Sequence, residues 1–370
     1  MQFFENIPQK FGFGCMRLPM KDGKVDMPAF EAMVDAYMAA GFSYFDTARV
    51  YLGGQSETAI RDAVAKRYPR ESFVLTDKLS GNLFHCKADI RPLFEKQLAS
   101  CGVDYFDFYL MHAQNRDNFE FYKKCHAYEQ AFALKAEGKI RHVGLSFHDS
   151  ADVLDRILTA YPQIEAVQIQ LNYVDFDDPA VQSRLCYEVC VKHGKPVIIM
   201  EPVKGGTLVN LPQKAETILT ELHGGSPASY AIRFAAGVDH VFMVLSGMSD
   251  MAQMQDNLSY MRDFRPLDAR ETAAVGEVCR IFRETQMISC TACRYCTDGC
   301  PKKIAIPDFF ALVNRERLRE GDSEAEQYRE ICLTHGKASD CIGCGKCERS
   351  CPQHLPIRAL LKSVAAKFES

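Results

Sequence analysis

The sequence predicts a (β/α)8 barrel followed by a small, mainly helical domain. Short apolar segments of β character alternate with longer segments of helical period, eight times in succession, between residues 10 and 265 of the 370-residue chain. Eight such repeats in a stretch of this length match the count and size of a closed parallel barrel, the TIM barrel. After residue 265 the alternation stops and two cysteine-rich motifs follow. We therefore expect two domains, at residues 1–265 and 266–370.

The alternation gives each element a predicted place. We expect strands at residues 12–18, 43–46, 73–76, 106–111, 142–146, 166–171, 196–200 and 241–246. We expect helices at residues 28–40, 56–66, 90–100, 119–137, 150–160, 179–193, 227–236 and 251–262. Apolar strands such as "PVIIM" and "HVFMVLS" are typical of a parallel sheet covered on its outer side. A doubly wound open sheet is the alternative, but it uses fewer strands, and no G-x-G-x-x-G follows the first one.

The composition is that of a globular protein with a real core. Apolar residues make up 47% of the chain and charged residues 25%, both in the usual range. The net charge of −4 gives no reason to expect nucleic-acid binding. No apolar run approaches the ~20 residues of a membrane span. The first ten residues, "MQFFENIPQK", lack the features of a signal peptide, so we expect a cytoplasmic protein.

Two cysteine motifs share one spacing. The first is Cys290-x2-Cys293-x2-Cys296-x3-Cys300-Pro301, and the second is Cys341-x2-Cys344-x2-Cys347-x3-Cys351-Pro352. This is the run of bacterial two-cluster ferredoxins, in which the fourth cysteine ligates the other cluster. The predicted ligand sets are therefore Cys290, Cys293, Cys296 and Cys351 for one 4Fe-4S cluster, and Cys341, Cys344, Cys347 and Cys300 for the other.

Zinc is the competing interpretation of these motifs. A structural zinc ion takes four ligands, usually from two CxxC pairs, and it has no use for a third and fourth cysteine followed by proline, twice. The 40 or so residues between the motifs look helical, so the tail resembles an α-helical ferredoxin. Four basic residues lie near the motifs: Lys302, Lys303, Lys346 and Arg349. They would offset the charge of the clusters, dock an acidic partner or simply be solvated, and the sequence leaves these three interpretations open.

Four polar residues lie at the carboxyl ends of successive predicted strands. Asp46 ends the second strand and Tyr51 follows in the loop, while Lys78 ends the third and His112 the fourth. The carboxyl ends of the strands form the catalytic face of such a barrel. Each residue alone has a structural explanation, but together they form a set suited to proton transfer.

The stretches "FGFGCMRLP", "GFSYFDTARVY", "TDKL", "LMH", "VGLSFH", "VQIQLNY" and "EPVKGG" resemble the aldo-keto reductase family. The resemblance covers roughly residues 8–262, with the motifs in the right order at barrel spacing. It implies carbonyl reduction with a nicotinamide cofactor and a catalytic set of Asp46, Tyr51, Lys78 and His112. Tyr51 would donate a proton to the carbonyl oxygen. Lys78, held by Asp46, would lower the pKa of Tyr51, and His112 would position the substrate.

The same resemblance implies where a dinucleotide binds. Ser146 and Gln168 would contact the carboxamide, with Asn172 in support. The loop of Pro202, Val203, Lys204, Gly205 and Leu208 would cross the pyrophosphate. The adenosine half would lie against Ser246, Gly247, Met248, Gln253, Asp256 and Asn257.

Several positions depart from the family pattern. Met248 and Gln253 stand where groups that bind the 2′-phosphate of NADP are common, so the choice between NAD and NADP stays open, with Lys204 as a partial substitute. Phe147 and Met200 replace a common Asn and a common aromatic residue. Asp77 replaces a Thr, and strand alternation is expected to turn it away from Lys78.

These observations predict an iron-sulfur oxidoreductase. The barrel would carry out NAD(P)-linked interconversion of a small carbonyl and alcohol, and the two 4Fe-4S clusters would transfer electrons or support the structure. A ferredoxin, a flavodoxin or another redox protein would be the partner, with neither nucleic acid nor membrane involved. The alternative is an electron-transfer protein whose barrel does not use nicotinamide. Its substrate would be reduced through the clusters by an external ferredoxin.

Overall fold

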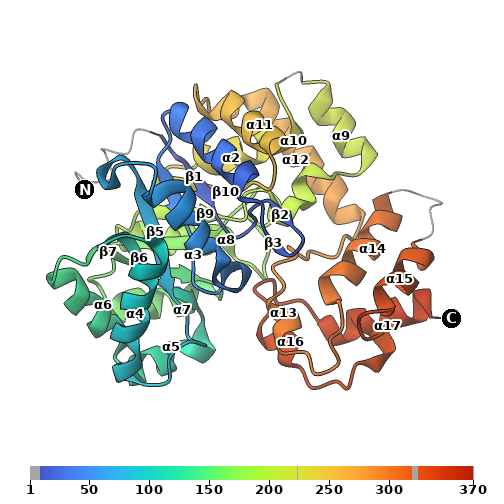
Figure 1. The fold of residues 1–370 in the computed structure, drawn as a ribbon. Helices are drawn as coiled ribbons and strands as arrows, with labels where there is room; N and C mark the ends of the chain where they lie inside the picture. The colour runs from blue at the N-terminus through green and yellow to red at the C-terminus, as the bar shows by residue number, and fades with distance from the viewer. Residues whose placement is uncertain (1–8, 223, 319–323, 370) are drawn as a thin grey trace. The chain divides into compact units, whose positions relative to one another are not determined.

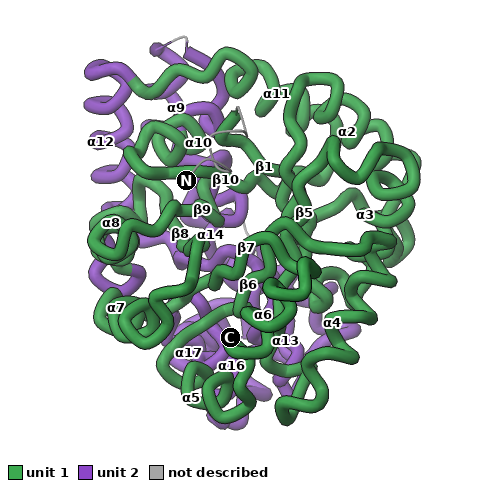
Figure 2. Tube along the Cα trace, turned by 90° about the vertical axis from the view of Figure 1, so that its left-hand side faces the viewer, with its two compact units in different colours: residues 1–177, 182–202, 231–267 green, residues 178–181, 203–230, 268–370 purple. Residues whose placement is uncertain are grey.

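The computed structural model describes residues 9–222, 224–318 and 324–369, and these form two compact units. Unit 1 comprises residues 1–177, 182–202 and 231–267, and unit 2 comprises residues 178–181, 203–230 and 268–370 (Figure 2). Unit 2 therefore contains the C-terminal segment together with a loop region that follows the seventh barrel strand. The predicted division at residue 265 remains a sequence-based prediction.

Unit 1 is the predicted barrel of eight parallel strands, closed in the order β1-β10-β9-β8-β7-β6-β5-β4 (Figure 1). The strands are β1 (Phe11–Gly14), β4 (Tyr44–Asp46), β5 (Val74–Leu79), β6 (Phe106–Gln114), β7 (Ile140–Phe147), β8 (Ala166–Gln170), β9 (Val197–Met200) and β10 (Val241–Gly247). A short hairpin of β2 (Met20–Lys21) and β3 (Lys24–Val25) lies outside the barrel sheet. The predicted strand at 12–18 thus ends at Gly14, and the hairpin was not predicted.

Helices cover the outside of the barrel. They are α2 (Met27–Ala39), α3 (Gln55–Ile60), α4 (Lys87–Cys101), α5 (Arg116–Lys124), α6 (Ala127–Ala136), α7 (Ala151–Ala160), α8 (Ser183–Lys192), α10 (Pro227–Gly237) and α11 (Met251–Met261), with a π-helical turn at Arg61–Ala65. The single helix predicted at 119–137 is wrong. The chain breaks at His126, whose φ of +52° belongs to the left-handed region, so two helices form there.

The barrel interior is filled by large side chains from several strands. Tyr44, Phe108, Ile198 and Leu245 belong to one buried cluster, as expected for a barrel whose centre is a packed core. Tyr44 also accepts a hydrogen bond from Thr76 at 2.7 Å. This packing fills the interior of the barrel, and the polar residues lie above it at the carboxyl ends of the strands.

Unit 2 is mainly helical, as predicted. Its elements are α9 (Gln213–Thr220), α12 (Ala269–Glu284), α13 (Tyr295–Asp298), α14 (Ile306–Leu318), α15 (Ala325–Cys332), α16 (Lys346–Arg349) and α17 (Ile357–Phe368), with 3₁₀ segments at Lys204–Val209 and Ala338–Asp340. A capping box of Asp268 and Glu271 starts α12, because each side chain accepts a hydrogen bond from the other's backbone N–H. The charged stretch predicted as helical forms α14 and α15; residues 319–323 of it lie outside the described residues.

The core of unit 2 is built from α14, α15 and α17. Phe309 and Tyr328 contact each other with ring centroids 4.6 Å apart, and Leu361 is buried in the same cluster. Two of the motif cysteines, Cys296 and Cys347, belong to this cluster too. Both cysteine loops therefore pack against the helical core of unit 2 through Cys296 and Cys347.

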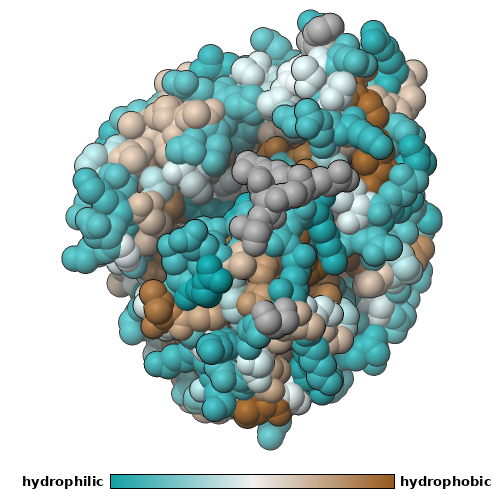
Figure 3. Space-filling model, turned by 90° about the vertical axis from the view of Figure 1, so that its right-hand side faces the viewer, coloured by the Kyte–Doolittle hydropathy of each residue, from teal (hydrophilic) through white to brown (hydrophobic). Residues whose placement is uncertain are grey.

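The surface is largely hydrophilic on the face drawn in Figure 3, where hydrophobic residues occur in small separate groups. Within the described part of the chain, no helix is both long enough and apolar enough to span a bilayer.

Candidate functional site

A buried ion pair forms the centre of the barrel site. The Lys78 ammonium donates to Asp46 Oδ1 at 2.5 Å and to the Thr47 carbonyl at 2.8 Å, and the Lys78 side chain is fully buried. Gln168 Nε2 donates to the other oxygen of Asp46 at 3.2 Å. Burial raises the pKa of Asp46, and the Lys78 charge opposes that rise. Strands β4, β5 and β8 therefore share one polar network.

Tyr51 lies beside this pair. The Lys78 nitrogen is 4.9 Å from the centroid of the Tyr51 ring, and the His112 ring is 5.8 Å from it, edge to face. The structure thus brings the four predicted residues together. It differs from the expectation for Tyr51, since burial raises its pKa well above 10 and the Asp46 carboxylate raises it further. Burial is the largest cause of the raised pKa of Tyr51, and the Asp46 carboxylate is the second.

His112 is held as a neutral imidazole. Its Nδ1 and the Ser80 hydroxyl are 2.6 Å apart, and burial lowers the pKa of His112 well below 6.5, with the Lys78 charge adding to the effect. Ser80 was not singled out from the sequence. It follows Lys78 by two residues on the same strand end, and that spacing is the signal that could have identified it.

Asp77 faces away from this network. Its carboxylate accepts from the Lys78 backbone N–H at 2.7 Å and is 3.8 Å from the Cys101 sulfur of α4. Burial raises the pKa of Asp77 well above 3.8, and the charge of Glu57 raises it further. Asp77 is thus a buried carboxyl group on β5 whose side chain faces the helix α4 outside the barrel.

The proposed carboxamide contacts lie on β7 and β8, whose register pairs Ser146 with Gln168. Ser146 Oγ accepts from the Ala113 backbone N–H at 2.7 Å. Asn172 is fully buried, and its amide donates to Asp175 at 2.8 Å and to the Glu201 carbonyl at 3.1 Å. Asn172 therefore supports the local backbone, and its role beside a carboxamide stays a prediction.

The residues expected to hold adenosine lie at the end of β10, on the loop that follows it and on α11. Asn257 Nδ2 donates to Ser246 Oγ at 2.9 Å. Gln253 is exposed and caps the helix start, because its Oε1 accepts from the Ser249 N–H at 2.8 Å. Met248 is fully buried. Of the two positions that depart from the family pattern, only Gln253 is thus open to a ligand.

The motif cysteines gather around two separate cavities in unit 2. One, with about 310 Å³ of space free of protein atoms, is lined by Cys290, Cys293, Cys296 and Cys351. The other, with about 340 Å³, is lined by Cys300, Cys341, Cys344 and Cys347. Each cavity thus takes three cysteines from one motif and the fourth from the other. Among the described residues, no group of three or more His, Cys, Asp or Glu side chains is close enough to hold a single metal ion.

The chemistry around the sulfurs suits an iron-sulfur cluster. The Ala292 backbone N–H donates to the Cys290 sulfur at 3.4 Å. Burial raises the pKa of Cys351, while the backbone N–H groups of Leu355 and Gln353 act in the opposite direction on its sulfur. Such N–H donors stabilise thiolates bound to a cluster and tune its potential. Four cysteines with backbone donors therefore fit the expected group at the cavity of Cys290, and four cysteines line the other cavity.

The loop expected to cross the pyrophosphate reaches the first cysteine cavity within unit 2. The Lys204 ammonium is fully buried and donates to Gln353 Oε1 at 3.3 Å. A Cβ on Gly205 would lie 2.3 Å from the Thr291 carbonyl oxygen. Thr291 and Gln353 both line the cavity of Cys290. This contact could not be predicted from the sequence, because its partners are far apart along the chain.

Comparisons with known proteins agree with this architecture. The sequence model of the Aldo/keto reductase family matches residues 10–280, and the model of the 4Fe-4S dicluster domain matches residues 289–355. The chain belongs to the aldo/keto reductase family, a family of oxidoreductases, and carries a 4Fe-4S dicluster domain at its C-terminal end.

Individual relatives are distant. Aldo-keto reductase family 1 member A1 of Mus musculus is 27% identical over 55% of this chain and 69% of its own length. An aldo-keto reductase of Mycolicibacterium smegmatis is 29% identical over 62% of this chain and 75% of its own length. The solved structure of an aldo-keto reductase from Klebsiella pneumoniae in complex with NADPH has a TM-score of 0.59 at 20% identity, covering 73% of this chain and 90% of that one. That likeness confirms the fold.

Proposed function

We propose that the protein is an NAD(P)-dependent reductase of small carbonyl compounds, reversible toward the alcohol, that exchanges electrons through two 4Fe-4S clusters. The observation that carries the first half is the buried pair of Lys78 and Asp46 with Tyr51 and His112 beside it. A packing role alone would not require a buried ammonium, a carboxylate and an imidazole at one barrel end. The second half rests on the two four-cysteine cavities.

The side chains divide the work of carbonyl reduction. Tyr51 donates the proton, because a tyrosine hydroxyl is protonated at neutral pH. Lys78, fixed by Asp46, supplies positive charge near the developing alkoxide. Neutral His112 orients the substrate oxygen through the ring nitrogen that Ser80 does not engage.

Two kinds of cofactor belong to this proposal. Bound nicotinamide supplies a hydride, whereas each 4Fe-4S cluster exchanges one electron at a time. For the dinucleotide we propose Ser146, Gln168, Asn172, Pro202, Val203, Lys204, Gly205, Leu208, Ser246, Gly247, Met248, Gln253, Asp256 and Asn257. For the clusters we propose Cys290, Cys293, Cys296 with Cys351, and Cys341, Cys344, Cys347 with Cys300.

The proposed partners are a small carbonyl or alcohol and a one-electron redox protein such as a ferredoxin or flavodoxin. Ligating thiolates must stay reduced, which is the condition of the cytoplasm. We therefore propose that compartment for the protein.

The test starts from protein purified without oxygen. Iron and sulfide analysis should show about eight of each per chain, the content of two cubanes. NADPH or NADH should then support reduction of test aldehydes, and Tyr51→Phe should lower kcat by about 10²–10⁴-fold. No turnover with either nucleotide, and no difference in Tyr51→Phe, would refute the nicotinamide half. Reduction of the substrate by an external ferredoxin without nucleotide would then favour the alternative function.

A further inference from the structure

The two cysteine cavities differ in their access to solvent. At the cavity of Cys290, Cys296 is buried and the other three cysteines are half-buried, and the buried residues Thr291, Phe310 and Gln353 line part of it. At the other cavity Cys344 is exposed, and Ile342 beside it is 61% exposed, one of the few large hydrophobic side chains with such exposure. Because electron transfer between proteins weakens steeply with distance, the cavity of Cys344 is the one that an external carrier can approach.

Positive charge surrounds this exposed cavity. Lys302 and Lys346 line it, and both are exposed. The guanidinium groups of Arg349 and Arg358 lie beside Gly345, 3.5 and 3.9 Å from the position that a Cβ there would take. We call these four residues the basic rim.

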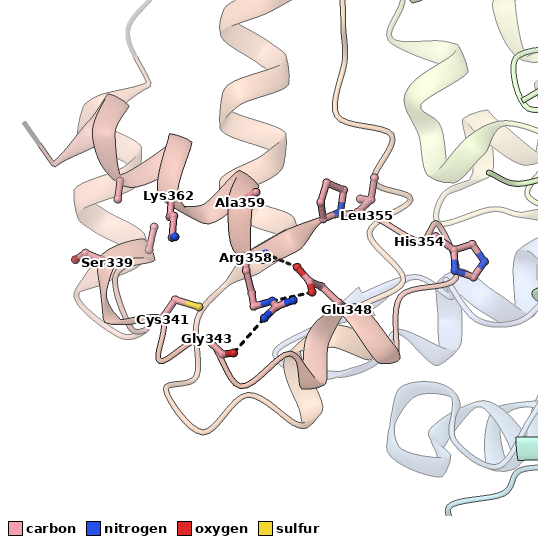
Figure 4. A pocket seen from close by; sticks show the side chains of 12 residues that line it. Ser339, Cys341, Gly343, Glu348, His354, Leu355, Arg358, Ala359 and Lys362 are labelled. Carbon is pink, nitrogen blue, oxygen red and sulfur yellow. Dashed lines mark hydrogen bonds and ion pairs between the residues drawn. The ribbon is translucent and has the colours of Figure 1, made fainter. Parts of the chain in front are cut away.

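One carboxylate lies within the rim and is already neutralised. Glu348 accepts from Arg358 at 2.7 Å, and Arg358 also donates to the Gly343 carbonyl at 3.4 Å (Figure 4). These bonds hold the Arg358 side chain against the loop of the second motif. The rim therefore carries an excess of positive charge.

A surface hollow adjoins the rim. It is lined by Cys341, Gly343, Glu348, Arg358 and Lys362 (Figure 4). Cys341 lines both this hollow and the four-cysteine cavity. The hollow thus brings the surface to a proposed cluster ligand, and Lys362 adds a positive charge to its lining besides the pair of Arg358 and Glu348.

We propose that the basic rim, with Ile342 at its apolar centre, is the docking surface for an acidic one-electron carrier protein. An apolar spot surrounded by charge of one sign favours a partner with the opposite sign and permits rapid, transient association. One electron leaves the reduced carrier and enters the cluster at Cys344, so the carrier is oxidised as the cluster is reduced. The proposal rests on the proposed function only in requiring that the clusters are bound.

The test is a stopped-flow measurement on the full chain with its clusters. The probe is a reduced plant-type [2Fe–2S] ferredoxin, an acidic carrier, and the variant combines Lys302→Glu, Lys346→Glu and Arg349→Glu. Arg358 is left in place because it supports the loop. Since electrostatic steering raises association rates by about 10–10³-fold, the variant should accept electrons at least tenfold more slowly at low salt. At high salt, where charges are screened, the difference should nearly vanish.

Two controls separate this proposal from the proposed function. Reduced methyl viologen, a small cation, should reduce the variant at least as fast as the wild type. Lys87→Glu with Lys96→Glu and Lys139→Glu, three exposed lysines of unit 1, should leave the ferredoxin rate unchanged. Equal ferredoxin rates in rim variant and wild type, or equal slowing by the unit 1 variant, would overturn the docking surface. Protein without iron, or inert to viologen, would overturn the proposed function itself.

Discussion

The loop after β9 contains adjacent glycines that form a matched pair for substitution. Gly205 and Gly206 both have positive φ, +64° and +96°. A Cβ on Gly205 would lie 2.3 Å from the carbonyl oxygen of Thr291, next to the cluster ligand Cys290 proposed above, whereas a Cβ on Gly206 would meet nothing within 4 Å. Gly205→Ala therefore tests the contact between this loop and the cysteine cavity, and Gly206→Ala measures the backbone strain alone.

The expected magnitudes follow from these two geometries. Placing an L-residue in the left-handed region costs about 1–2 kcal/mol, and both variants incur this cost. Only at Gly205 must the backbone of Thr291 also move, an overpacking that costs about 1–3 kcal/mol. We expect Gly205→Ala to lose about 2–5 kcal/mol and Gly206→Ala about 1–2 kcal/mol. Over a chain of 370 residues, the excess corresponds to a melting temperature lower by roughly 1–4 °C.

Two measurements check this prediction. Thermal unfolding followed by circular dichroism gives the difference in stability. The rate of iron release to a chelator, without oxygen, reports whether the cavity of Cys290 has loosened. Gly205→Ala should release iron faster than Gly206→Ala. If both variants melt together and release iron at one rate, the loop does not support the cavity and the reasoning fails.

Three further predictions concern the barrel site. Lys78→Met leaves Asp46 buried without its partner and should cost about 3–5 kcal/mol in denaturant unfolding at pH 7; a loss under 1 kcal/mol would contradict the buried pair. Tyr51→Phe should change stability by no more than about 0.5 kcal/mol, because the Tyr51 hydroxyl bonds to none of the described residues. Burial holds the pKa of His112 below 6.5, so the unfolded chain binds the proton more readily and stability should fall as pH drops below 6.5. His112→Gln should flatten that slope between pH 7 and 5, and an unchanged slope would argue against a neutral buried imidazole.

Much of the barrel could be predicted from the sequence because its signals are local. Apolar runs of strand length, followed by helical periods, marked all eight strands within a few residues. The break at His126 was missed because neither glycine nor proline marks it, and only packing imposes the left-handed turn there. The helix α9 was also missed, since it lies in a segment that looked like a loop.

In the candidate site, too, some features could be predicted from the sequence and others depend on packing. The residues at the strand ends could be found because strand order fixes which side chains share the barrel mouth. The raised pKa of Tyr51 could not be predicted, since it depends on how deeply the ring is buried and on how fully Asp46 engages Lys78. The cysteine sets followed from their spacing, but the difference in exposure between the two cavities depends on which helices cover them.

The arrangement within unit 2 argues that the clusters carry electrons. If the clusters only stabilised the fold, both cavities could be equally buried, and neither would need charged residues around it. Instead Cys344 is exposed beside the basic rim, whereas Lys204 and Gly205 contact Gln353 and Thr291 in the lining of the cavity of Cys290. The loop of these two residues is the one proposed to hold the dinucleotide. The proposed carrier would deliver single electrons, and two clusters together would store two of them, the number that one hydride transfer requires in addition to a proton.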